Sequence, residues 1–407
     1  MPTTHLIAVA ALCLLLLALP ARGETPYAPW AHGPPNDPAY FPVGVWAQAP
    51  RNIEAYQELG LNLYVSLHGG PTEEQLTALR DAEMHAITAL NDYARSLLAE
   101  ESELLDVVVA WMHRDEPDNA QAAAGGGYGP PVATDEIQRL GDEWREIDPT
   151  RPVYLNLGWA VGWDGWYGRG VRTNHPEDYP EYIKGTDIVS FDIYPGSMEP
   201  GSAISDEHWR VAWGTQRLRD WAEPEQIVWT ILECSAISSH GQVSPTELRA
   251  QVWMSIIHGA TGIVWFTHVF DEDGYVTDSA ILRDEELRPV VHEVNHRLHE
   301  LAPVINSPSV SDRLTVEIVD GEADDAIRRE RSIEPVSAML KEYDGAMYLF
   351  AVRMRDSEAT ARFTIDGLEG EHVAELIGDE GDVALEAGQF EQRFDAWGTR
   401  LYRIAVE

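Results

Sequence analysis

Two glutamates stand where their carboxyl groups could do chemistry together. Glu116 follows the apolar run from Val107 to Met112, and Glu233 ends the apolar run that starts at Ile227. Buried parallel strands read as continuous runs of this kind, so a carboxylate at the end of one suits chemistry better than packing. Two such groups fit the hydrolysis of a glycosidic bond, in which one carboxyl protonates the leaving oxygen and the other attacks the sugar or activates water.

The segments around these glutamates alternate between strand-like and helix-like patterns, which predicts βαβ units around a parallel sheet. About eight pairs fit between Phe41 and Pro303, and Pro303 is expected to end the last helix. We therefore predict a (β/α)8 barrel, whose reactive groups collect at the C-terminal ends of the strands. The expected strands are 41–47, 61–68, 84–90, 104–112, 152–159, 187–194, 227–232 and 262–268. Glu116 and Glu233 then follow strands four and seven.

Two further segments flank the barrel. The apolar run from Leu6 to Leu19, followed by small residues, predicts a signal peptide over residues 1–23, with a retained membrane anchor as the alternative. From about Ser309 the pattern changes to short alternating segments such as 346–353, which predicts an antiparallel β-sandwich. The expected domains are thus the barrel over 24–305 and the sandwich over 306–407, in a secreted or periplasmic protein.

The chain is strongly acidic, with a formal net charge of −39 over 407 residues. Nucleic-acid binding depends on clustered Lys and Arg, so this balance argues against nucleic acid and against anionic membrane surfaces as partners. Once the leader is removed, no membrane partner is expected. No feature of the sequence indicates an oligomeric state.

With Asp115-Glu116-Pro117 after strand four and Glu233 after strand seven, residues 41–303 resemble the clan A glycoside hydrolases. The resemblance implies a retaining hydrolase of a β-linked oligo- or polysaccharide, with Glu116 as acid/base, Glu233 as nucleophile, and no metal or organic cofactor. One position departs from the family pattern: an Asn usually precedes the acid/base, and here the residue is Asp115. An ionised carboxylate cannot donate a hydrogen bond to a sugar hydroxyl as that amide does.

Further residues are expected to bind the substrate, because sugars stack on aromatic rings and loops at this end of a barrel concentrate function. The resemblance places Trp265 beneath the reacting sugar. Core packing is the competing interpretation for Trp46 and Tyr194. The full set of candidates is Asp115, His113, Arg114, Trp46, His68, Trp159, Trp163, Trp166, Asp192, Tyr194 and Trp265.

Two other functions stay open. A carbohydrate-binding barrel without catalysis is suggested by Asp115 in place of Asn. A zinc metallopeptidase is suggested by His292, Glu293 and His296, which match the H-E-x-x-H pattern. That motif lies in a helix with an apolar stripe suited to packing on the outside of the barrel, away from the reaction face.

Overall fold

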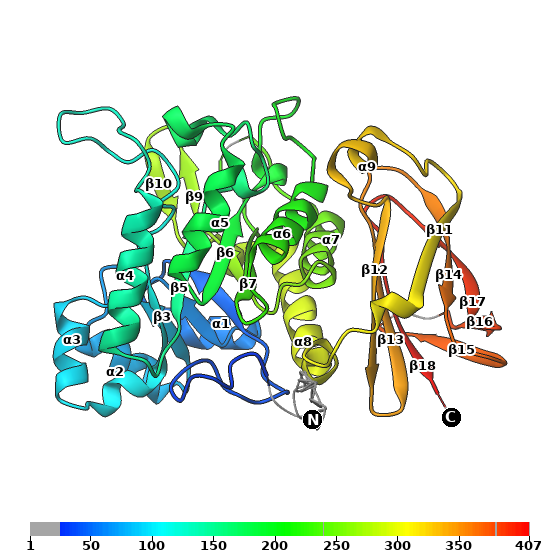
Figure 1. The fold of residues 1–407 in the computed structure, drawn as a ribbon, viewed down its shortest axis with the longest axis horizontal. Coiled ribbons are helices and arrows are strands. Elements are labelled where there is room, and N and C mark those ends of the chain that lie inside the picture. The colour runs from blue at the N-terminus through cyan, green and yellow to red at the C-terminus, as the bar shows by residue number, and fades with distance from the viewer. Residues whose placement is uncertain (1–24, 239, 379–380, 407) are drawn as a thin grey trace, which may run out of the picture.

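Eight parallel strands close into a barrel in the N-terminal part of the chain, as Figure 1 shows. In this computed structural model, which describes residues 25–238, 240–378 and 381–406, each strand pairs with the next and β8 pairs with β1. The predicted barrel is confirmed, whereas the predicted signal peptide lies outside the described residues. The strands are β1 (Val43–Trp46), β2 (Leu63–Val65), β3 (His85–Thr88), β4 (Val108–Met112), β5 (Val153–Leu157), β6 (Ile188–Asp192), β7 (Ile227–Glu233) and β8 (Ile263–Phe266).

Helices follow the strands and surround the barrel. Two of them begin with the capping box that their sequences predict: the Thr72 hydroxyl accepts from the backbone of Gln75, and that of Ser244 accepts from Glu247, each at 3.3 Å. The helices are α1 (Ile53–Glu58), α2 (Glu73–Asp81), α3 (Asp92–Ala99), α4 (Thr134–Ile147), α5 (Tyr179–Tyr182), α6 (Trp209–Trp221), α7 (Pro245–Ile257) and α8 (Leu287–Ile305).

Some boundaries differ from those expected. Residues Glu103–Val107 form a 3₁₀ turn, so the predicted strand over 104–112 was too long. The buried apolar residues of this turn have the same sequence pattern as a strand. Helix α8 passes through Pro303 and ends at Ile305, because burial of Val304 and Ile305 offsets the backbone hydrogen bond that proline removes. A short hairpin, β9 (Val269–Asp271) and β10 (Gly274–Thr277), follows β8 and was not expected.

The barrel has an inner and an outer apolar layer. Ile227, Trp229 and Ile231 of β7 join the inner cluster, while Val228 and Leu232 pack with the helices. Such strands are buried on both faces, which is why they read as unbroken apolar runs.

The C-terminal part is one eight-stranded antiparallel sheet, in the order β11-β14-β17-β16-β15-β18-β13-β12. In Figure 1, β12 and β13 lie next to the barrel helices and β14 and β17 lie on the far side, with an apolar core between these layers. The predicted barrel with a C-terminal β-sandwich is confirmed. The elements are β11 (Leu314–Asp320), α9 (Ala326–Arg331), β12 (Val336–Tyr343), β13 (Ala346–Arg353), β14 (Ala359–Ile365), β15 (Glu371–Leu376), β16 (Val383–Glu386), β17 (Gln389–Phe394) and β18 (Thr399–Ala405).

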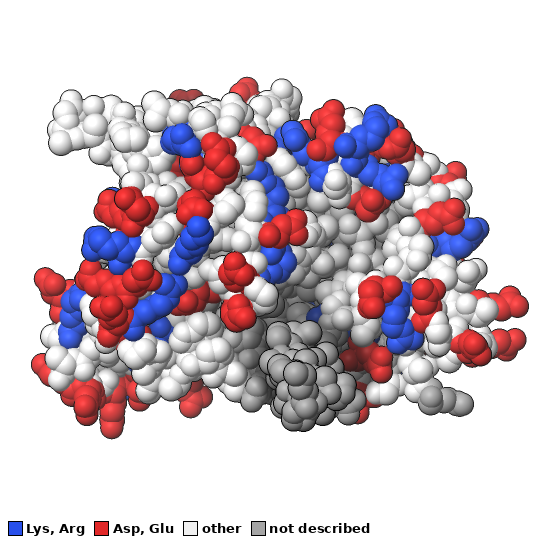
Figure 2. Space-filling model, in the orientation of Figure 1, with Lys and Arg blue, Asp and Glu red and all other residues white. Residues whose placement is uncertain are grey.

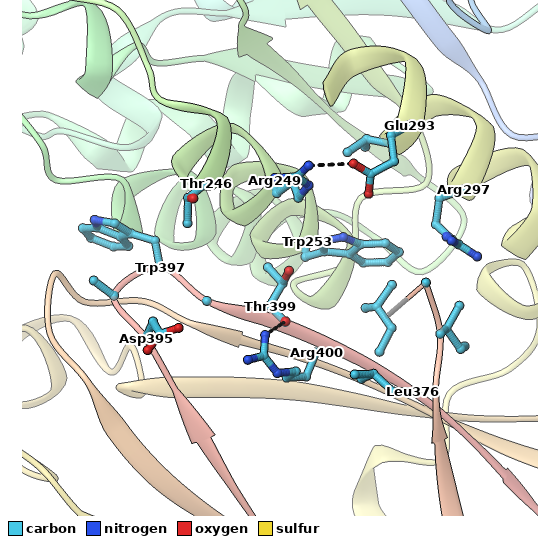
Figure 3. A pocket seen from close by; sticks show the side chains of 16 residues that line it. Thr246, Arg249, Trp253, Glu293, Arg297, Leu376, Asp395, Trp397, Thr399 and Arg400 are labelled. Atoms are coloured by element: carbon cyan, nitrogen blue, oxygen red, sulfur yellow. Dashed lines mark hydrogen bonds and ion pairs between the residues drawn. The ribbon is translucent and has the colours of Figure 1, made fainter. Parts of the chain in front are cut away.

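The two domains are joined by apolar packing. Trp253 of α7 stacks on Phe350 of β13, with ring centroids 5.4 Å apart and planes 8° from parallel. Beside this contact a cavity of about 600 Å³ lies between α7, α8 and the strand β18. Figure 3 shows Trp253 at its centre and the ion pair between Arg249 and Glu293 at its rim, where nitrogen and oxygen are 2.6 Å apart.

The surface agrees with the acidic composition. Figure 2 shows Asp and Glu over both domains, with Lys and Arg often beside them. None of the helices within the described ranges has both the length and the apolarity that crossing a membrane would require.

Candidate active site

A cleft of about 390 Å³ lies at the C-terminal ends of the barrel strands. Aromatic rings and carboxylates share its wall, the combination expected of a carbohydrate site. Its lining residues come from the ends of β1, β4, β5, β6 and β8 and from the segments that follow β5 and β8: Trp46, Asp115, Glu116, Asn156, Trp159, Trp166, Asp192, Tyr194, Phe266, His268 and Phe270.

Glu116 is held in an unusual backbone conformation. Its φ angle is +42°, in the left-handed region that non-glycine residues rarely adopt and that recurs at functional sites. The backbone N–H of Glu116 donates to the carbonyl of Asn156 at 3.2 Å, and the amide of Asn119 donates to its Oε2 at 2.9 Å. The other side is open only because residue 158 is glycine: a Cβ there would lie 2.9 Å from Glu116 Oε1. The carboxyl group is therefore fixed in place.

Asp192 sits beside Glu116 and is 6% exposed. Both carboxyl groups line the cleft, and the charge of Asp192 acts on Glu116. Asn156 links Asp192 to Asp115, because its amide donates to Asp115 Oδ1 at 3.0 Å and to Asp192 Oδ1 at 3.2 Å. Trp159 Nε1 donates to Asp192 Oδ2 at 3.2 Å. Three carboxyl groups thus share one cleft, and a single amide joins two of them, Asp115 and Asp192.

Crowding of these carboxyl groups changes their proton affinity. Burial, followed by the charges of Asp192, Asp115 and Asp118, raises the pKa of Glu116 well above its usual range. Burial and the charge of Asp115 raise the pKa of Asp192 to about 7. Burial raises the pKa of Asp115 to about 6, although a hydrogen bond from Asn156 opposes the change. A proton is therefore retained in the cluster near neutral pH.

Glu233 ends β7 and pairs with Phe266 of β8, and its expected role as nucleophile stays a prediction. Its side chain is fully buried and does not line the cleft. Oε1 accepts from the backbone of Gly196 and from Gln251 of α7, and Oε2 accepts from the hydroxyl of Ser197, each at 2.8 Å. Both oxygens are therefore occupied by donors that tie β7 to α7 and to the loop after β6.

Two predicted binding residues point out of the barrel. His113 is buried against α4, where its ring stacks on Trp144 at 4.6 Å and burial lowers its pKa to about 4. Trp265 is 1% exposed and donates to Asn295 of α8 at 3.0 Å. In both cases the alternation of side chains along a strand puts the residue on the outer face.

Three others do not line the cleft. Arg114 and His68 are exposed, and Trp163 packs on Trp166 with centroids 5.6 Å apart. The predicted residues that do line the cleft are Asp115, Glu116, Trp46, Trp159, Trp166, Asp192 and Tyr194.

Sequence reasoning missed five residues of the site. Phe266, next to the predicted Trp265, faces the cleft, followed by His268 and Phe270. Asn156 and Asn119 position the carboxyl groups. The signal for Asn156 was present, because a polar residue interrupts the apolar run of β5.

The H-E-x-x-H motif is on α8, outside the barrel. Its Glu293 carboxylate is paired with Arg249, and His296 Nε2 is 3.4 Å from the backbone oxygen of Glu58. No cluster of three or more His, Cys, Asp or Glu suited to a metal occurs within the described ranges. The placement offers no support for the metallopeptidase alternative.

No protein-family model and no curated protein matches the sequence. Solved structures share the fold. The GH42 beta-galactosidase Gan42B from G. stearothermophilus is 9% identical, with a TM-score of 0.56 over 90% of this chain and 98% of that chain. A beta-galactosidase from Bacillus circulans sp. alkalophilus is 9% identical, with a TM-score of 0.54 over 90% and 99%. An alpha-amylase from Geobacillus thermoleovorans is 9% identical, with a TM-score of 0.51 over 90% and 98%. The chain therefore has the barrel-plus-β-domain fold that these glycoside hydrolases share.

Proposed function

We propose that this protein is a glycoside hydrolase with Glu116 as its general acid. The observation that carries the proposal is the placement of Glu116 and Asp192: two carboxyl groups with raised pKa values line one aromatic cleft at the C-terminal mouth of the barrel. Glycoside hydrolysis needs one carboxyl group protonated and a second ionised at the same pH. Raised pKa values among neighbouring carboxyl groups meet that requirement, because one group keeps its proton while another loses it.

Asp192 is the second carboxyl group of the proposal, in place of Glu233. Inversion requires carboxyl groups about 6.5–9.5 Å apart, with a water molecule between them, whereas retention uses about 5–5.5 Å. We propose the shorter spacing and hence retention, because Glu116 and Asp192 line the same cleft. The indole N–H of Trp159, which donates to Asp192 Oδ2 at 3.2 Å, helps to orient it.

Two displacements complete the proposed reaction. Glu116 gives its proton to the glycosidic oxygen while the C–O bond breaks, and an Asp192 oxygen bonds to the anomeric carbon. Glu116, now ionised, then takes a proton from water as the water oxygen attacks that carbon and releases Asp192. The galactosidases and the amylase of similar fold make galactosides and glucans the first substrates to try, with β-linked sugars foremost.

A substrate screen followed by trapping tests the proposal. Purified protein is incubated with a panel of polysaccharides and aryl glycosides, with Glu116→Gln as the inactive counterpart. An activated 2-deoxy-2-fluoro glycoside of the sugar that is cleaved should then accumulate as a covalent adduct. Peptide mapping should find the label on Asp192.

The outcomes separate the alternatives. A label on Glu233 would restore the nucleophile implied by the family resemblance and overturn the role of Asp192. Retained sugar binding without any turnover would favour the non-catalytic carbohydrate-binding barrel. Glu233→Gln is the matched control, because it changes a carboxylate of the same barrel that does not line the cleft.

We also propose export of the protein, on the strength of the apolar run from Leu6 to Leu19. Expression with its natural leader should yield a mature N-terminus near residue 24 outside the cytoplasm. An unprocessed chain in the membrane fraction would support the anchor instead.

A further inference from the structure

We infer that a continuous strip of aromatic rings carries the cleft outward in two directions and binds a linear, neutral polysaccharide. The bond that is cleaved would then lie within the chain, and the enzyme would act in the endo manner. The cleavage part of this inference rests on the proposed function, and the binding part rests on the aromatic rings.

The first half of the strip runs from the loop after β5 to the end of β6. Neighbouring ring centroids are 4.5 Å apart for Tyr167 and Trp166, 4.6 Å for Trp166 and Trp159, and 5.8 Å for Trp159 and Tyr194. The indoles of Trp159 and Trp166 are fixed by hydrogen bonds to Asp192 and to Asn119. This half is therefore rigid where it meets the carboxyl groups.

The second half runs from β6 to the hairpin β9–β10. Tyr194 and Phe266 have centroids 4.9 Å apart, Phe266 and His268 stack at 4.8 Å, and His268 is 6.2 Å from Phe270. Tyr275 of β10 follows, 6.2 Å from Phe270. Burial lowers the pKa of His268, so its ring is neutral at pH 7 and continues the apolar surface.

Both ends of the strip are open to solvent. Tyr167 is 73% exposed and Tyr275 is 58% exposed, and neither lines the cleft. A ligand confined to the cleft would not reach them. Exposed aromatic residues continuous with a cleft indicate a binding surface, because sugar rings offer apolar faces that pack on such rings. The occupant that covers the whole strip is a chain of sugars longer than the cleft.

The charges around the strip favour a neutral chain. None of the cleft residues is Lys or Arg, and three of them are carboxylic acids. The turn of the hairpin adds Asp271, Glu272 and Asp273, in a protein of net charge −39. A polysaccharide that carries carboxylates or sulfates would be repelled by the ionised carboxylates of the turn and by those cleft carboxylates that have lost their proton.

The test uses the full chain and removes the two exposed end rings. Tyr167→Ala and Tyr275→Ala are compared with Tyr343→Ala, which changes a 39% exposed tyrosine of the C-terminal domain. For each variant, kcat/KM is measured on the neutral polysaccharide that the wild type cleaves and on an aryl glycoside of the same sugar. We expect the ratio of polymer to aryl glycoside to fall about 2- to 10-fold for each end ring and to stay constant for Tyr343→Ala.

Product analysis provides a second measurement. The wild type should lower the viscosity of the polymer early, by cuts inside the chain, and a sulfated form of the same polymer should bind more weakly at low salt. Release of single sugars from one end, or an unchanged ratio in both ring variants, would overturn the inference.

Binding to Glu116→Gln distinguishes the two proposals. If wild-type protein cleaves nothing while this variant binds the neutral polymer, and the end-ring changes weaken that binding, the proposed hydrolysis fails and the strip stands as a binding surface. If the wild type cleaves polymer and the ring changes leave binding to Glu116→Gln unaltered, the strip fails and the hydrolase stands.

Discussion

Replacing Asp192 by Asn should abolish hydrolysis and also stabilise the protein at neutral and alkaline pH. The folded protein keeps this buried carboxyl group protonated up to a pKa of about 7, compared with 3.8 for the ordinary group. A difference of that size corresponds to about 4 kcal/mol. Since the folded-state pKa is raised, the native protein binds the proton more tightly than the unfolded chain does. The wild type therefore loses stability as pH rises from about 4 to about 7.

The amide introduced by Asp192→Asn avoids that loss because it carries no charge. It keeps the hydrogen bond from Asn156 but gives up the one from Trp159, because the new NH2 group cannot accept a hydrogen bond, and this loss costs about 1 kcal/mol. We expect the free energy of unfolding of Asp192→Asn to exceed that of the wild type by about 3 kcal/mol at pH 8, and we expect no gain below pH 4.

Thermal and urea unfolding of wild type and Asp192→Asn at pH 4, 6 and 8 measure this difference. The stability of the variant relative to the wild type should increase from pH 4 to pH 6 and again to pH 8. The variant should show no turnover at any of these pH values. A variant that is less stable than wild type at pH 8, or a difference that does not change with pH, would refute the account of the carboxyl cluster. The stability of Glu116→Gln provides a comparison, because this variant also removes one ionisable carboxyl group from the cluster.

Three other measurements follow from the site and the domain contact. The pH profile of kcat/KM should be bell-shaped. Activity is lost as pH falls through the lower pKa of the Glu116–Asp192 pair, near 7, because Asp192 becomes protonated, and it is lost again above the higher pKa, because Glu116 gives up its proton. A profile that is flat from pH 5 to 9 would contradict this expectation. Glu233→Ala should lower the free energy of unfolding by about 3 kcal/mol or more, because three buried donors lose their acceptor, and urea titration would show an unchanged midpoint if the network did not matter. Trp253→Ala should cost about 3–5 kcal/mol through the cavity left opposite Phe350, and calorimetry that finds the same stability as wild type would show that the domains do not depend on this contact.

The barrel could be predicted because its signal is local and repeated: apolar runs, capping boxes and breaks recur along the chain. The direction of a side chain at a strand end could not. Residues 263–266 of β8 are all apolar, since both faces are buried, so period-two alternation gives no sign that Trp265 faces α8 while Phe266 faces the cleft. The same ambiguity placed His113 in the cleft.

The carboxyl cluster depends on register between strands, which no single strand reveals. Asn156 pairs with Ser190 across β5 and β6, and this pairing brings its amide between Asp115 and Asp192. Glu233 was correctly placed at the end of β7, yet the orientation of its carboxylate follows from donors on Gly196, Ser197 and Gln251, which come from other elements. The sequence therefore predicts where Glu233 lies along its strand, but it does not predict which residues of other elements bond to its carboxylate.

Helix α7 is buried on both of its sides. Gln251 reaches inward to Glu233, and Trp253, two residues later, reaches outward to Phe350 of the sandwich. A helix at the rim of a barrel ordinarily presents a polar face to water, so this one would expose indole and aliphatic surface if the sandwich were removed. The C-terminal domain therefore cannot be exchanged simply by cutting the sequence at the domain boundary. An exchange of the C-terminal domain with that of another barrel protein would have to carry the outer residues of α7 along with it.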